Sequence, residues 1–333
     1  MYKVILKNGK SFNCDSNTTI FEAAKQNGVV LEHSCLAARC RSCAVLVKQG
    51  STVDVKEDLI LTKEEKLNHW TLACNAKPSS DLLLDIDDLS GILTFEKRIV
   101  PAKIADIRII TDRVIKVVLR LPPNANFKYN AGQYVNIIRG SIRRSYSISN
   151  CDSTMGLLAF LIKNYENGLM SNYWFKEASV NDLLRIEGPF GSFVYRESAA
   201  ENIVFLTNGT GIAPVKAILE SLSNADEATP RFTNRKIWLF MGHRYESDVL
   251  WAANKEIRNI NLKVVPVLSR GSKNWEGENG YVQDVALQYN IPLANAQVYA
   301  CGSGDMIESA KALFVERGLN KNNFFSDAFV ETH

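Results

Sequence analysis

The residues with the clearest chemical signature are four cysteines in the first quarter of the chain. Cys35, Cys40 and Cys43 follow one another with the spacing C-x4-C-x2-C, and Cys74 stands alone further along. Zinc sites of four cysteines usually come as two C-x2-C pairs. Three cysteines in one tight loop and one distant cysteine form the spacing that holds a 2Fe–2S cluster. We therefore expect these four cysteines to be cluster ligands, with zinc ligands or unligated core cysteines as the alternatives.

Length and composition limit the class of protein. A chain of 333 residues is long enough for two or three domains, and 46% hydrophobic with 23% charged residues is typical of a folded globular protein. The net charge of +3 is too small to indicate nucleic-acid binding. We expect no signal peptide and no membrane span, because no apolar run is long enough for either. Seven cysteines, an odd number, argue against a secreted disulfide framework, so we expect a cytoplasmic protein.

The segments around the cysteine loop predict a small β-rich domain. Asn8-Gly9, a strong hairpin signal, lies between two short strand-like runs. A capping box at residues 19–22 starts a helix. Residues 43–48 and 82–86 have the composition of returning strands. Together these elements predict a β-grasp 2Fe–2S domain over residues 1–92.

Residues 99–197 have the pattern of an all-β domain. Residues 114–121 alternate apolar and polar side chains, as a half-buried strand does. Further short strands are separated by turns, which predicts an antiparallel β-barrel. Two motifs lie on it, Arg144-Ser145-Tyr146-Ser147 and, downstream, Gly168-Leu169-Met170-Ser171.

From residue 200 to residue 333, strands alternate with helices, which predicts a Rossmann-like α/β domain with a parallel sheet. Residues 203–206 form a short apolar strand that ends in the loop Gly209-Thr210-Gly211, and Pro214 suits the first turn of the helix that follows. Glycines let the backbone approach a nucleotide, whose pyrophosphate then faces the helix N-terminus. A later strand ends in Cys301-Gly302.

In this order, the motifs resemble those of the ferredoxin–NADP reductase superfamily. Its R-x-Y-S strand and G-x-x-S helix start match residues 144–147 and 168–171, and its C-G motif matches residues 301–302. Its G-G-T-G-x-x-P loop matches residues 208–214, except that Asn208 replaces the first glycine. The resemblance implies that FAD binds to the barrel and a nicotinamide dinucleotide to the third domain.

The resemblance also implies roles for individual residues. Arg144 neutralises the FAD pyrophosphate, Tyr146 lies against the isoalloxazine, and Ser147 places its hydroxyl near flavin N5. The other implied cofactor-binding residues are Lys163, Gly168, Met170 and Ser171 for the flavin, and Gly209, Thr210, Gly211, Pro214, Cys301 and Gly302 for the nucleotide. The implied catalytic residues are Ser147, Cys301 and Phe329. Cys301 is expected beside the nicotinamide, and Phe329 is expected to cover the flavin until the nicotinamide displaces it.

Each implied role has a purely structural alternative. Arg144 and Tyr146 also suit a solvated arginine beside a core tyrosine on a barrel strand. Cys301 also suits a small buried residue at a strand end.

Selection between NADH and NADPH depends on residues near the nucleotide's ribose. An acidic residue favours the free 2′-hydroxyl, whereas arginine holds a 2′-phosphate. Asp248 lies in a segment that resembles the corresponding loop of NADH-using relatives, while Arg244 and Ser269-Arg270 would permit NADPH. We expect NADH as the donor, with NADPH permitted.

Residues near the C-terminus resemble those of one smaller group within this superfamily. Residues 298–303 and 324–329 resemble the reductases of 3,6-dideoxyhexose biosynthesis. That resemblance implies electron flow from NADH through FAD and the 2Fe–2S cluster to a partner protein, a dehydrase carrying pyridoxamine phosphate. Two alternatives stay open: the reductase component of a ring-hydroxylating oxygenase, and a redox-sensing or scaffold protein. Members of this group usually have glycine where Ala38 and Arg41 stand, and Arg39 with Arg41 would raise the cluster potential or dock an acidic partner.

Overall fold

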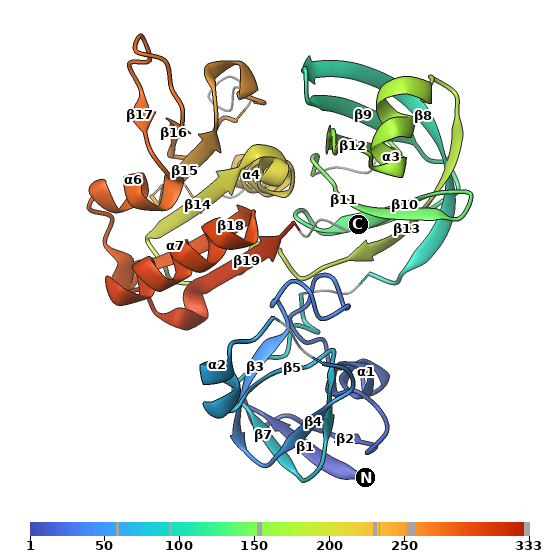
Figure 1. Ribbon diagram of the computed structural model, residues 1–333, viewed down its shortest axis with the longest axis vertical. Helices are drawn as coiled ribbons and strands as arrows, with labels where there is room; N and C mark the ends of the chain where they lie inside the picture. The colour runs from blue at the N-terminus through green and yellow to red at the C-terminus, as the bar shows by residue number, and fades with distance from the viewer. Residues whose placement is uncertain are drawn as a thin grey trace. The chain divides into compact units, whose positions relative to one another are not determined.

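The computed structural model describes residues 1–57, 60–92, 95–151, 155–228, 232, 234–251 and 257–329. The chain forms two compact units, Met1–Phe95 and Glu96–His333 (Figure 1). The predicted FAD-binding and nucleotide-binding domains lie together in the second unit. The sequence-based division of that unit into 99–197 and 200–333 therefore stays a prediction, as does the end of the first domain at residue 92.

The N-terminal unit is built on a five-stranded mixed sheet with strand order β2-β1-β7-β3-β5. Its strands are β1 (Tyr2–Leu6), β2 (Ser11–Cys14), β3 (Ala44–Gln49), β5 (Trp70–Leu72) and β7 (Leu82–Leu84), and β4 (Thr52–Asp54) pairs separately with β6 (Ala76–Pro78). The predicted hairpin joins β1 to β2, with Gly9 at φ 84° in the turn. β1 and β7 run parallel, and the predicted β-grasp architecture is confirmed.

Two short helices of this unit begin with capping boxes. In α1 (Ile20–Gln26), the Thr19 hydroxyl accepts from the backbone N–H of Glu22 at 3.2 Å, and the Glu22 carboxylate accepts from the N–H of Thr19. The same box, formed by Thr62 and Glu65, starts α2 (Lys63–Leu67). The apolar face of α1 is buried in the core of the unit.

The first half of the C-terminal unit is a curled antiparallel sheet with strand order β11-β10-β13-β8-β9-β12. Its strands are β8 (Arg98–Thr111), β9 (Val114–Arg120), β10 (Tyr134–Arg139), β11 (Ile142–Ser147), β12 (Leu157–Lys163) and β13 (Leu183–Phe190). A bridge between Ile148 and Phe160 joins its two edges and closes the barrel. The predicted antiparallel barrel is confirmed.

The expectation that this segment is all β was incomplete. The helix α3 (Leu169–Asn172), whose start at Gly168 was predicted, continues into the π-helical turn η1 (Tyr173–Glu177). Met170, Tyr173 and Trp174 are all buried in the barrel core. Their i, i+3, i+4 spacing is that of a helix face, which explains why this stretch leaves the strand pattern.

The second half of the C-terminal unit is a parallel sheet with strand order β17-β16-β15-β14-β18-β19. Its strands are β14 (Asn202–Asn208), β15 (Lys236–His243), β16 (Leu262–Leu268), β17 (Glu278–Asn279), β18 (Ala296–Gly302) and β19 (Phe324–Ala328). The strand order reverses between β14 and β18. Ligands of such sheets bind at this switch point, beyond the carboxyl ends of the strands.

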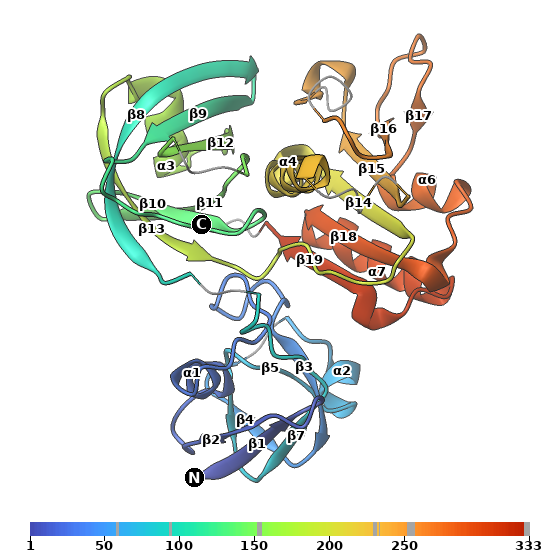
Figure 2. The ribbon, with the colours of Figure 1, turned by 180° about the vertical axis from the view of Figure 1, so that it is seen from behind.

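Helices cover both faces of the parallel sheet (Figure 2). They are α4 (Ile212–Ala228), α6 (Val282–Gln288) and α7 (Gly304–Glu316), with short 3-10 turns η2 (Gly209–Gly211), η3 (Glu246–Asp248), η4 (Leu293–Asn295) and η5 (Lys321–Asn323). α4 packs into one core layer, and α6 with α7 pack into the other. Because Phe193 and the partly buried Leu161 join the α4 layer, the barrel and the parallel sheet share apolar contacts.

Candidate redox and nucleotide-binding sites

The four predicted cluster ligands lie as two pairs. The thiols of Cys35 and Cys40 are hydrogen-bonded to each other, and the sulfur atoms of Cys43 and Cys74 are 3.2 Å apart. Each iron of a 2Fe–2S cluster takes two cysteine thiolates. The residues therefore fit a two-iron cluster, of which Cys35 and Cys40 would hold one iron and Cys43 and Cys74 the other.

Hydrogen bonds favour one thiolate in each pair. The Cys40 thiol lowers the pKa of Cys35 to about 6, against the effect of burial, and the backbone N–H groups of Ala37 and Arg39 contribute at 3.4 Å each. In the second pair, the hydrogen bond from Cys43 lowers the pKa of Cys74. The same hydrogen bonds, together with burial, raise the pKa of the donor thiols Cys40 and Cys43. Thiolate is the form that binds iron, so metal binding must release the protons of these two thiols.

Three residues of the cluster loop hold a backbone conformation that favours glycine: Leu36, Ala38 and Arg41. Ala38 and Arg41 have φ of 56° and 61°, in the left-handed region. The Arg41 guanidinium donates to the carbonyl of Ile60 at 2.8 Å and forms an ion pair with Glu65 in the first turn of α2. The pair ties the cluster loop to α2 and balances part of the Arg41 charge, which leaves Arg39 as the exposed arginine of the loop.

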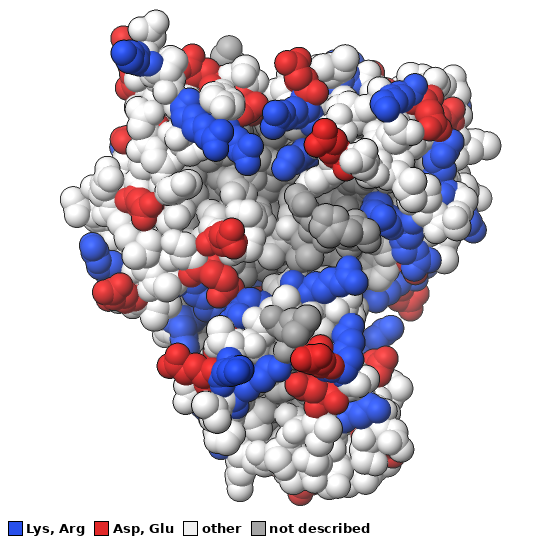
Figure 3. All heavy atoms as spheres, in the orientation of Figure 1, with Lys and Arg blue, Asp and Glu red and all other residues white. Residues whose placement is uncertain are grey.

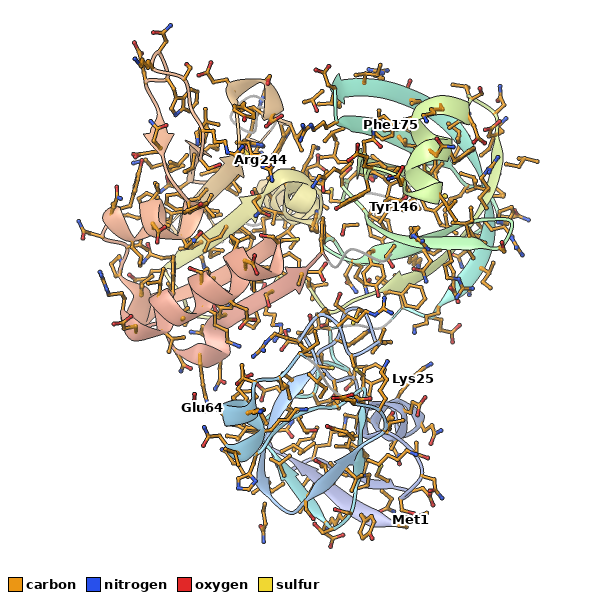
Figure 4. The ribbon with its side chains drawn as sticks, viewed as in Figure 1. Met1, Lys25, Glu64, Tyr146, Phe175 and Arg244 are labelled. Carbon is orange, nitrogen blue, oxygen red and sulfur yellow. The ribbon has the colours of Figure 1, made fainter. Side chains whose placement is uncertain are left out.

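The predicted flavin residues gather on β11 and α3. Arg144 and Tyr146 lie two residues apart on β11 and so share one face of the strand. The Trp174 indole N–H donates to the Tyr146 hydroxyl at 3.0 Å, and the two rings meet edge to face. Burial raises the pKa of Tyr146 to about 12, so its hydroxyl stays neutral. Figure 4 labels Tyr146 and Phe175 on this part of the barrel.

The arginine and the helix start on this face fit an anionic ligand. Among the described residues, the Arg144 guanidinium makes one side-chain hydrogen bond, to the neighbouring carbonyl of Arg143 at 2.9 Å. Its remaining N–H groups suit a pyrophosphate. Gly168 begins α3 without a side-chain cap, and a Cβ there would lie 3.2 Å from the Tyr165 carbonyl. Ser171 is turned inward, its hydroxyl accepting from the N–H of Tyr165 at 3.0 Å.

A cavity of about 700 Å³ lies at the carboxyl ends of the parallel strands. Its volume is in the range of cofactor sites. The barrel contributes Thr111, Arg113, Val114, Lys163 and Tyr165 to its lining, and the parallel-sheet half contributes the rest. In Figure 3, lysine and arginine side chains border the hollow between the two halves of the C-terminal unit. Basic side chains at a cavity entrance attract an anionic dinucleotide.

The cavity brings together part of the predicted site. The predicted residues that line it are Lys163, Gly209, Thr210, Arg244, Asp248, Gly302 and Phe329. Lys163, expected to assist FAD, lies here with its ammonium group 4.8 Å from the ring centre of Tyr165. Three predicted nucleotide residues, Gly211, Pro214 and Cys301, are not among the lining residues.

Cys301 lies behind the cavity wall. Its side chain is fully buried, and burial raises the pKa of its thiol well above the usual value. The neighbouring Gly302 lines the cavity, and its carbonyl accepts from the N–H of Phe329 at 2.8 Å. The catalytic roles of Cys301, Phe329 and Ser147 stay predictions.

His243 ends β15 and lines the cavity, although no sequence motif predicted a role for it. It is 7% exposed, and among the described residues neither ring nitrogen has a hydrogen-bond partner. Burial lowers its pKa to about 4, so the ring is neutral near pH 7. Its place directly before Arg244, at the end of a parallel strand, was the signal that could have identified it.

Three of the four residues expected to select NADH or NADPH line the same cavity. Arg244, Asp248 and Ser269 line the cavity (Figure 4 labels Arg244). Arg270 does not line it; its guanidinium is 3.4 Å from the hydroxyl of Tyr245. Of the residues expected to select the nucleotide, the acidic Asp248 and the basic Arg244 thus line the same cavity.

Among the described residues, no helix has the length and apolar character that a membrane crossing needs.

Three family models match the chain in the predicted order. They are the 2Fe-2S iron-sulfur cluster binding domain at residues 4–79, the oxidoreductase FAD-binding domain at 101–195 and the oxidoreductase NAD-binding domain at 205–312. The models agree with the cysteine pairs, the barrel and the parallel sheet described above. The cofactors are therefore a 2Fe–2S cluster, FAD and a nicotinamide dinucleotide.

Whole-chain relatives share this three-part organisation. The chain is 37% identical to CDP-6-deoxy-L-threo-D-glycero-4-hexulose-3-dehydrase reductase of Yersinia pestis, over 97% of this chain and 96% of that protein. It is 28% identical to the phenol hydroxylase P5 protein of Acinetobacter pittii, over 97% and 92%. The crystal structure of an Amycolatopsis cytochrome P450 reductase superposes with a TM-score of 0.71 at 24% identity, covering 99% of both chains. The chain therefore belongs to the family of the hexulose-dehydrase reductase, NAD(P)H-dependent iron–sulfur flavoproteins of the ferredoxin–NADP reductase superfamily.

Proposed function

We propose that this protein passes electrons from NADH to a dehydrase that carries pyridoxamine phosphate, in the C3 deoxygenation of a CDP-linked hexose. The observation that carries the proposal is the 37% identity to the hexulose-dehydrase reductase, against 28% for the phenol hydroxylase component at the same coverage of this chain. None of the seven cysteines of this chain, all of them within the described residues, forms a disulfide, which suits the reducing cytoplasm, where we place the protein.

The electrons balance without an additional oxidant or reductant. NADH loses a hydride and becomes NAD⁺, and the partner takes up the two electrons one at a time. When bound, FAD supplies the conversion of a hydride into single electrons, and the 2Fe–2S cluster carries one electron at a time. The partner dehydrase binds the sugar, and this chain does not contact it.

The residues of the chain hold and orient these groups. Arg144 and the start of α3 bind the FAD pyrophosphate, Tyr146 forms a neutral wall for the isoalloxazine, and Ser147 lies on the adjoining end of β11. The cavity beside β14 and β18 holds the dinucleotide, with Arg244 and Asp248 near its ribose. We assign NADH as the donor because Asp248 lines the cavity, where a carboxylate favours the free 2′-hydroxyl of the ribose, whereas Arg270 does not line it.

Reconstitution with two acceptors tests the proposal. Supplied with NADH, the protein is expected to support deoxygenation by a pyridoxamine-phosphate-dependent dehydrase and to give little turnover with a ring-hydroxylating oxygenase. The reverse preference would identify an oxygenase reductase. Failure to reduce any one-electron acceptor, including ferricyanide, would leave the redox-sensing or scaffold function.

A further inference from the structure

The end of β14 and the end of β18 are joined by a pair of side-chain hydrogen bonds. The Asn208 carboxamide donates through Nδ2 to the hydroxyl of Ser303 at 2.8 Å and accepts through Oδ1 from the N–H of Ser303 at 2.9 Å. Asn208 is the last residue of β14, and Ser303 follows the last residue of β18. The two residues meet where the strand order of the sheet reverses, and both line the nucleotide cavity.

Neighbouring contacts show how closely the two loops approach. A Cβ at Gly302 would lie 1.9 Å from Asn208 Oδ1, and a Cβ at Gly211 would lie 2.2 Å from the carbonyl oxygen of Cys301. Ser303 occupies the N-cap position of α7, yet its hydroxyl caps no N–H of that helix. It accepts from Asn208 instead, so the cap that a serine normally supplies is replaced by the link between the loops.

We propose that Asn208 is a positioning residue that fastens the turn at residues 301–303 to the glycine loop and so keeps the dinucleotide cavity formed before the nucleotide binds. A preformed cavity spares the nucleotide the cost of ordering two loops, which raises its affinity. Asn208 stands where the superfamily pattern has glycine, so this chain adds a fastening that a glycine cannot supply. The inference rests on the proposed binding of the dinucleotide in this cavity.

Calorimetric titration of NAD⁺ into the intact, FAD-loaded protein tests the inference. Each neutral hydrogen bond corresponds to roughly a fivefold change in an equilibrium constant. S303A removes one bond and is expected to raise the dissociation constant about fivefold, and N208G, which removes both, about 25-fold. The S303A/N208G double variant is expected to bind as N208G does, because both changes break one link.

Two further readouts separate positioning from a general loss of structure. At saturating NADH, the limiting rate of flavin bleaching in stopped-flow experiments is expected to stay within about twofold of wild type, since only formation of the cavity is impaired. The matched control is N323G, which removes an Asn side-chain hydrogen bond to the carbonyl of Ala296 at the opposite end of β18. It is expected to bind NAD⁺ as wild type does.

Unchanged affinity in both S303A and N208G, or multiplied effects in the double variant, would overturn the inference while leaving the proposed function intact. A wild-type protein that binds no NAD⁺ and whose flavin is not reduced by NADH would overturn both.

Discussion

Gly211 provides a sharp test of how closely the glycine loop packs against the end of β18. A Cβ at Gly211 would lie 2.2 Å from the Cys301 carbonyl oxygen and 2.7 Å from its carbon, whereas ordinary contact begins at 3.4 Å. These are backbone atoms, so G211A must shift the backbone of one or both loops. Overpacking of this kind costs about 1–3 kcal/mol, which corresponds to roughly 5- to 150-fold weaker dinucleotide binding if it falls on the cavity.

Gly209 supplies the matched control two residues away. It has φ 51°, and a Cβ there would meet nothing within 4 Å. G209A therefore carries only the cost of a left-handed alanine, about 1 kcal/mol, or roughly fivefold in affinity. The assay is NAD⁺ binding by calorimetry together with the NADH dependence of flavin bleaching. A larger effect of G209A than of G211A would refute the close approach of the two loops.

Three further predictions concern the cluster and the barrel. C40S is expected to abolish NADH-dependent cytochrome c reduction while flavin bleaching by NADH persists; loss of both activities would contradict the proposed electron route. Y146F leaves the buried Trp174 N–H without its acceptor and is expected to lower the free energy of unfolding by about 1–3 kcal/mol, measured by urea denaturation; an unchanged stability would count against this bond. Partial burial acts to raise the pKa of Glu65, but its hydrogen bonds with Arg41 and an N–H of the capping box give a net lowered pKa. The carboxylate of Glu65 therefore stabilises the cluster loop above about pH 4.5 and loses this effect as the pH falls below it. The E65Q variant is expected to lose its visible cluster absorbance faster than wild type near pH 7. The difference between the two proteins is expected to shrink as the pH falls.

The structural features that the sequence predicted are those set by local patterns of residues. The spacing of Cys35, Cys40 and Cys43 identifies the cluster loop because its ligands come from one short segment. Strand alternation and the glycine loop placed β9 and β14 correctly for the same reason. A pattern confined to a few neighbouring residues is visible without knowledge of the fold.

The contacts that sequence could not predict join residues that only the fold brings together. Arg41 and Glu65 are 24 residues apart, and Asn208 and Ser303 are 95 apart. Such pairs depend on strand order and on the rotamers of both partners, which no local periodicity encodes. The sequence left two alternatives for Cys301, a residue of the site and a buried residue at a strand end, for a related reason: a C-G motif fixes the backbone position but not which residue of the pair reaches the cavity.

Anaerobic titration with NADH, followed by visible absorbance and EPR on the same sample, shows whether electrons pass from the flavin to the cluster within one protein. We expect the flavin absorbance to bleach and the EPR signal of a reduced 2Fe–2S cluster to appear in the same sample. In Cys74→Ser, the EPR signal is expected to be lost while bleaching remains. A protein whose flavin is reduced by NADH but whose cluster stays oxidised would refute the transfer of electrons from NADH to the cluster.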